Sequence, residues 1–154
     1  MKQGFKMLVL VCITLGLGVT ESYSQSAKRI AELLINEKNT VIDDSPFENY
    51  LKSVNFKLDP SNSSSTKFFT KGNGDDKVKL GLSIIDLGDA VVRNVEISTG
   101  NPNVIRKMEN ELIEFGLVAK RKSGAMGDYV DFDGKGITAS SGPLSIVIGC
   151  FHKN

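Results

Sequence analysis

Cysteine is scarce in this chain. Its 154 residues include two cysteines, Cys12 and Cys150. Cys12 lies in an apolar N-terminal stretch that we expect to be removed, so the remaining domain has one thiol and cannot form an intramolecular disulfide. A small exported domain without disulfides has to be stabilised by hydrophobic burial, and its sequence therefore needs well-marked apolar faces.

Histidine is scarcer still, because His152 is the only one. A serine hydrolase triad would have no other base, and the sequence contains no G-x-S-x-G, glycine-rich phosphate loop or H-E-x-x-H motif. Cys150 and His152 are two residues apart on a predicted strand and could form a thiolate–imidazole pair or half of a metal site. We favour a buried, packing role for Cys150 and a solvated tail position for His152. The sequence thus predicts no catalytic residue, no metal and no cofactor.

The chain also lacks an excess of charge of either sign. Of its 19 basic and 18 acidic residues, Lys2, Lys6 and Glu21 fall in the N-terminal stretch, which leaves 17 of each. A balanced chain has no overall field that would attract it to nucleic acid or to an anionic membrane. The composition therefore disfavours a nucleic-acid partner.

The N-terminal stretch has the organisation of a secretory signal peptide. Lys2 and Lys6 precede an apolar run over residues 7–19, and Ser22 and Ser24 supply small residues where a signal peptidase reads them. We favour cleavage over an uncleaved anchor, because spanning about 30 Å of hydrocarbon takes about 20 apolar residues. The sequence predicts a cut after Ser24, a single domain over residues 25–154 with no transmembrane segment, and a periplasmic or secreted location.

The clearest structural element is a helix over residues 101–116. Asn101 suits the N-cap, Pro102 suits the first helical position, and Gly116 lies where a left-handed C-terminal residue is expected. Apolar residues recur at three- and four-residue steps and form one stripe, while acidic residues occupy much of the remaining surface. The stripe consists of Val104, Ile105, Met108, Leu112 and Phe115. Two further helices are predicted over residues 26–38 and 45–54.

Most of the remaining chain has the period of two that is typical of strands. Val78, Leu80 and Leu82 share one face and lysines take the other, a pattern typical of an antiparallel sheet covered on one side. The last strand has apolar residues on both sides, which indicates a central or doubly covered strand. Strands are predicted over residues 55–59, 66–71, 77–84, 91–97, 117–122, 129–132, 137–140 and 143–151.

These segments predict an α+β fold, an antiparallel sheet of about six to eight strands packed on one face by two or three helices. Each half of the chain offers a helix followed by three strands, beginning at Ser45 and at Asn101, about sixty residues apart. A duplicated αβββ unit would give this order. Chance repetition of a common order would also give it, and we favour chance because the halves share few identical residues.

A basic run and one separate arginine are candidate ligand contacts. Lys120, Arg121 and Lys122 form a run beside a predicted hairpin, either as a solvated edge that prevents strand pairing or as a contact for an anion. Arg93 has the parity of Val95, on the face predicted to be buried. It either lies at a sheet edge with its head group in solvent, which we favour, or points into a cleft and binds a ligand carboxylate through two hydrogen bonds.

The acidic residues form no evident metal or catalytic set. Asp131 and Asp133 resemble the start of a calcium loop, but Lys135 occupies an expected ligand position, and a hairpin turn explains the pattern better. The acidic turns around Asp76 and Asp86 flank one strand and are expected to be about 33 Å apart by strand rise. Paired acid–base chemistry is therefore not predicted from these residues.

The sequence as a whole predicts an exported, non-catalytic binding or interaction domain. Its ligand would be a protein partner or a small molecule held between helix and sheet. The alternative is a small exported hydrolase that acts on envelope or extracellular glycans through two acidic groups about 5–10 Å apart. A structural module of an envelope assembly is a third hypothesis, which a large exposed apolar patch would favour.

Overall fold

The computed structural model describes residues 26–36, 45–60, 66–125 and 127–153, so the predicted leader lies outside the described residues. These ranges form three α-helices, eight strands and a one-turn 3₁₀ helix. No helix among them is long and apolar enough to cross a membrane. The bounds are α2 Ser26–Asn36, α3 Ser45–Ser53, β1 Lys57–Leu58, β2 Thr66–Lys71, η1 Gly74–Asp76, β3 Val78–Asp86, β4 Ala90–Thr99, α4 Pro102–Phe115, β5 Val118–Gly124, β6 Gly127–Gly134, β7 Ile137–Ser141 and β8 Ser145–Lys153.

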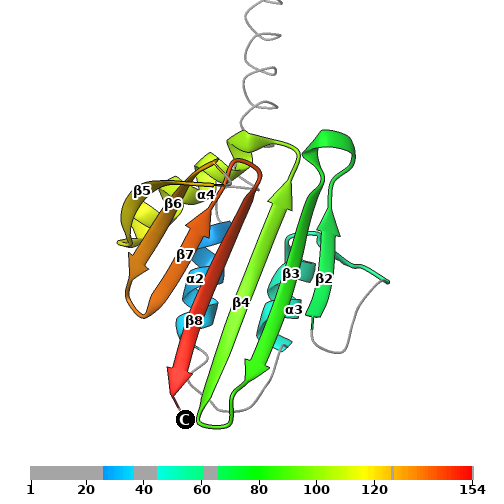
Figure 1. Cartoon of the computed structure of the whole chain (residues 1–154). Helices are drawn as coiled ribbons and strands as arrows, with labels where there is room; N and C mark the ends of the chain where they lie inside the picture. The colour runs from blue at the N-terminus through cyan, green and yellow to red at the C-terminus, as the bar shows by residue number, and fades with distance from the viewer. Residues whose placement is uncertain (1–25, 37–44, 61–65, 126, 154) are drawn as a thin grey trace, which may run out of the picture.

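The eight strands form one open antiparallel sheet in the order β1-β2-β3-β4-β8-β7-β6-β5 (Figure 1). The α+β prediction is therefore confirmed. The strands of the two halves of the chain run in the same order from each edge of the sheet to the central β4–β8 pair. Each half is one helix followed by four strands, α3 with β1–β4 and α4 with β5–β8. The predicted repeat was one strand short, because β4 and β7 were left out of it. Duplication of an αββββ unit stays a prediction.

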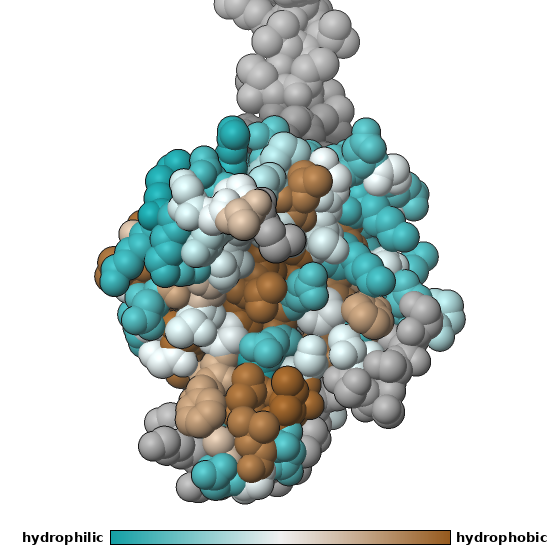
Figure 2. Space-filling view, viewed as in Figure 1, coloured by the Kyte–Doolittle hydropathy of each residue, from teal (hydrophilic) through white to brown (hydrophobic). Residues whose placement is uncertain are grey.

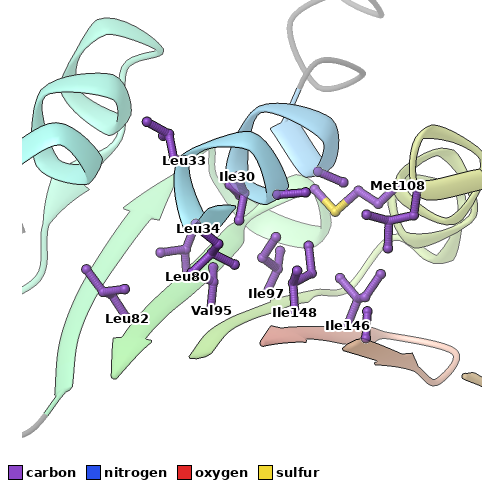
Figure 3. Packing of buried hydrophobic residues seen from close by; sticks show 14 of the residues in the cluster. Ile30, Leu33, Leu34, Leu80, Leu82, Val95, Ile97, Met108, Ile146 and Ile148 are labelled. Carbon is purple, nitrogen blue, oxygen red and sulfur yellow. The ribbon is translucent and has the colours of Figure 1, made fainter. Parts of the chain in front are cut away.

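All three helices lie on one face of the sheet, with α2 behind its middle and α3 and α4 toward its two sides (Figure 1). Alternate side chains of the central strands point toward these helices, as the period of two predicts. Each fully buried Ile, Leu or Phe side chain contributes about 1.5–3 kcal/mol to folding. Figure 3 shows this core, with Ile30 and Leu34 of α2 and Met108 of α4 facing Leu80, Leu82, Val95, Ile97, Ile146 and Ile148 of the sheet, while Leu33 of α2 points away from these strands.

None of the three described helices lies over the opposite face of the sheet. β8 is central, as predicted, but it is not doubly covered: Val147 is 38% exposed and Phe151 is 55% exposed. Ile85, Val92 and Phe151 are partners in register across β3, β4 and β8 and therefore form an apolar row on this face. Figure 2 shows hydrophobic residues gathered down the uncovered face among polar ones. The predicted strand residue Leu144 lies outside β8 and is half exposed.

Helix α4 begins and ends as the sequence predicts. The Asn101 side chain accepts a hydrogen bond from the Asn103 backbone N–H at 3.0 Å, and Pro102 occupies the first helical position. Gly116 adopts φ 103° and donates its N–H to the Ile113 carbonyl, which closes the last turn. A residue with a Cβ would be strained in this conformation, so glycine is required here.

Glu111 of α4 is buried, although the sequence pattern placed the acidic residues of this helix in solvent. Its carboxylate accepts hydrogen bonds from the Ala27 and Lys28 backbone N–H groups, with N···O distances of 3.0 and 3.4 Å. These N–H groups belong to the first turn of α2, where no carbonyl of the same helix is available to accept them. Glu111 therefore caps α2 from another helix and joins α2 to α4.

We expect the substitution Glu111→Ala to lower the free energy of unfolding by about 1 kcal/mol, because two N–H groups of the first turn of α2 lose their acceptor. Urea unfolding at neutral pH measures this. Glu114→Ala on the same helix is the matched control, since Glu114 is exposed and its removal should change stability by less than about 0.5 kcal/mol. Equal losses in the two variants would contradict the capping role.

Burial raises the pKa of Glu111, and its two backbone hydrogen bonds only partly oppose this effect. The folded protein therefore holds this proton more tightly than the unfolded chain does. The resulting stabilisation is fully present below the unfolded pKa and is lost as the pH rises through the folded pKa. Relative to Glu111→Gln, the natural protein should thus lose stability as the pH rises from about 4 toward neutrality.

Candidate functional site

A cleft of about 710 Å³ lies between the first half of α4 and the β5–β6 hairpin, with the end of β7 at its base. Helix α4 contributes Ile105, Arg106 and Glu109 to its lining, and the strands contribute Arg121, Val130 and Ser141 among others. Cavities of about 300–1,000 Å³ are typical of small-molecule sites. The cleft is therefore large enough for a ligand.

Strand register explains how the sheet side of the cleft is formed. Arg121 of β5 is the partner of Val130 of β6, which in turn is the partner of Ser141 of β7. Partners in register project to the same face of a sheet. Ser141 is 2% exposed and its hydroxyl donates a hydrogen bond to the Glu109 carboxylate of α4, so this face is the one that meets the helix.

Helical spacing explains the opposite side of the cleft. Ile105 is buried in the apolar stripe of α4, and Arg106 follows it toward the flank of the helix. Glu109 lies one turn beyond Arg106 on the same flank, because residues three apart are neighbours on a helix surface. This wall thus presents one cation and one carboxylate.

The two carboxylates in the cleft are each held by a serine hydroxyl. Ser141 donates to Glu109, and Ser123 donates to Asp128 at 2.6 Å. Arg106 and Arg121 form no ion pair with any residue of the described ranges. The cleft therefore contains guanidinium and carboxylate groups that do not neutralise one another by direct pairing.

The predicted basic run divides between the two faces of the sheet. β5 is the edge strand, which agrees with the interpretation of residues 120–122 as a solvated edge. Arg121 and Lys122 both line the cleft, but Lys122 alternates with Arg121 along β5, and its ammonium lies 2.6 Å from the Asp131 carboxylate on the uncovered face. This hydrogen bond raises the pKa of Lys122 and lowers the pKa of Asp131. Lys120 is the register partner of Asp131 on the uncovered face and does not line the cleft.

The prediction that Arg93 lies at a sheet edge with its head group in solvent is wrong. β4 is a central strand between β3 and β8, and Arg93 is 3% exposed on the helix-covered face, opposite Cys150 in register. It does not line the cleft either. A strand of the first half of the chain became central because the second half returns beside it, which periodicity along one strand does not reveal.

Cys150 and His152 do lie side by side. The Cys150 sulfur is 3.2 Å from His152 Nε2, which is also 3.1 Å from the Leu34 carbonyl oxygen in the last turn of α2. Cys150 is buried, as predicted, whereas the prediction of a solvated His152 is wrong because α2 covers it. Burial raises the pKa of Cys150, while the positive charge of Arg93 opposes this effect. Among the described residues, no group of three or more His, Cys, Asp and Glu is placed to hold a metal ion.

We expect Cys150 to react slowly with iodoacetamide in the folded protein, because its thiol is buried and its pKa is raised. Timed labelling at neutral pH followed by mass spectrometry of the peptide that contains Cys150 measures the rate. Alkylation should be markedly slower than in the guanidinium-unfolded chain, because burial restricts access to the sulfur and disfavours the thiolate. Similar rates in the two states would show that Cys150 is accessible and activated.

Several cleft residues were missed in the sequence. Arg106 and Glu109 carry a usable signal, since they lie three residues apart beside the apolar stripe of the helix predicted over residues 101–116. Ser141 and Asp128 carry none, because only the register of three strands brings them to α4. The sequence did not reveal where the β5–β6 hairpin lies relative to α4.

No protein-family model matches this chain, and comparison with curated proteins and with solved structures also finds no match. The function therefore has to be inferred from the residues that line the cleft.

Proposed function

We propose that this chain is an exported, non-catalytic binding domain whose ligand occupies the cleft between α4 and the β5–β6 hairpin. The single observation that supports this proposal is the chemistry of the lining. Arg106 and Arg121 reach a cavity of about 710 Å³ without an ion-pair partner in the described residues. Export rests on the signal-peptide pattern of residues 1–24.

The lining has the two kinds of surface that a ligand site needs. Arg106 and Arg121 offer polar groups, and guanidinium donors bind planar carboxylates or phosphates through two parallel hydrogen bonds. Pro102, Val130 and further apolar atoms offer a surface for the body of a ligand. Such sites bind through apolar contact and take their orientation from a few polar groups.

A fragment screen on the full-length expressed chain tests this proposal. We expect small molecules that carry a carboxylate to shift the methyl resonances of Ile105 and Val130 in the cleft rather than those of Val92 and Val147 on the uncovered face. Arg121→Gln should weaken these fragments about tenfold, because a charge-assisted hydrogen bond contributes about 1.5–3 kcal/mol. Lys120→Gln removes the same charge from the same strand on the other face and should leave binding unchanged. Fragments that are indifferent to Arg121, or that map elsewhere, would contradict the proposal.

The carboxylate-dependent hydrolase is the second candidate function, because Glu109 and Asp128 line the same cleft. Each of these carboxyl groups accepts a hydrogen bond from a serine hydroxyl, Glu109 from Ser141 and Asp128 from Ser123. A glycosidase needs one carboxyl group to act as an acid as well. Because both carboxyl groups have the same kind of partner, neither is distinguished as the acid, and we favour binding over hydrolysis.

Assays with aryl glycosides and with isolated cell-wall glycan separate these two functions. We expect no turnover above the uncatalysed background for the natural chain, Glu109→Gln or Asp128→Asn. Turnover by the natural chain that is abolished by both substitutions, with thermal unfolding unchanged, would overturn the non-catalytic proposal. Ser140→Ala on the uncovered side of β7 serves as the control for nonspecific effects.

A further inference from the structure

Charges of both signs face the cleft from each of its two walls. The α4 wall carries Arg106 and Glu109, and the hairpin wall carries Arg121 and Asp128. No ion pair joins an arginine to a carboxylate among these four residues. The cleft is thus neither a cationic pocket nor an anionic one.

Each carboxylate in the cleft already accepts a hydrogen bond that orients it, Glu109 from a buried serine and Asp128 from an exposed one. The Ser141 hydroxyl that holds Glu109 is itself 2% exposed, and Ser123 holds Asp128 at 2.6 Å. A group that is already oriented loses little conformational freedom when a ligand binds. Glu109 and Asp128 are therefore prepared to receive a donor.

We propose that the ligand of this cleft is zwitterionic and carries a carboxylate and an ammonium group, as a peptide with free ends does. This inference rests on the proposed binding function. The guanidinium groups of Arg106 and Arg121 bind the ligand carboxylate, and Glu109 or Asp128 accepts hydrogen bonds from the ammonium. Pro102 and Val130 contact the apolar part between these ends.

Ligands of other charge types fit this lining less well. A simple anion would meet the repulsion of both carboxylates, and a simple cation would meet that of both arginines. A ligand without charged groups would remove water from all four charges without giving any of them a new partner, which is unfavourable. Only a ligand with both signs replaces water at each kind of group.

Four tetra-alanine peptides test the inference on the full-length chain. They carry both free ends, an acetylated N-terminus, an amidated C-terminus, or both caps, and so differ in charge with little change in shape. Calorimetry at low salt measures their affinities, with the methyl shifts of Val130 as the readout for binding in the cleft. We expect the peptide with two free ends to bind at least tenfold more tightly than either singly capped peptide, and the doubly capped peptide to bind most weakly.

Paired substitutions assign each end of the peptide to its protein groups. Arg106→Gln with Arg121→Gln should remove the advantage of the free carboxylate and keep that of the free amine. Glu109→Gln with Asp128→Asn should do the reverse, and glutamine at 109 still accepts the Ser141 hydrogen bond. The matched controls on the uncovered face are Lys79→Gln with Lys120→Gln, and Glu96→Gln with Asp133→Asn. They should change neither advantage.

The outcomes separate this inference from the proposed function. Equal binding of capped and free peptides, or advantages that survive the paired substitutions, would overturn the zwitterionic ligand. If no peptide binds but fragments of one charge sign map to the cleft, the zwitterion inference is wrong and the binding function is retained. If neither peptides nor fragments perturb the cleft, both are wrong.

Discussion

Coverage of the β4–β8 pair by helices is the constraint on which the rest of this structure depends. The two halves of the sheet meet only at this pair, and its inward residues include Val95, Ile97, Ile146 and Ile148, all essentially inaccessible to solvent. α2 supplies the apolar cover at the centre of the sheet (Figure 3). The Glu111 contacts fix the start of α2 to α4. Because α4 also forms one wall of the cleft, the same contact that holds the core together positions the candidate site.

Much of this architecture could be predicted from local patterns. The alternation at Val78, Leu80 and Leu82 indicated a sheet covered on one side, and Asn101, Pro102 and Gly116 marked both ends of α4. These signals are local, because a cap or a strand face is set by residues within one or two turns or strands. Strand order is not local. The central position of β4, and hence the burial of Arg93, follows from the return of the second half of the chain beside the first.

Only some of the residues that line the cleft could be predicted from the sequence. Lys120, Arg121 and Lys122 were all candidates because a basic run is visible in the sequence. Lys120 does not line the cleft, and Lys122 forms an ion pair with Asp131 on the uncovered face. Glu109 and Glu111 both come from the acidic surface of the α4 pattern, yet one lines the cleft and the other caps a distant helix. Sequence spacing placed them on the flank of a helix, and only tertiary packing gave them different roles.

The mirrored halves of the sheet differ in how each helix meets its strands. In the first half, Glu48 of α3 forms an ion pair with Lys67 of β2 at 2.8 Å, and this contact lowers the pKa of Glu48. In the second half, α4 faces the hairpin with charges that are left unpaired across the gap. In the first half of the sheet an ion pair thus joins the helix to its strands, whereas in the second half the helix and the hairpin leave a cleft between them. Substitutions that change ligand binding in the cleft therefore need not alter the contact between α3 and β2.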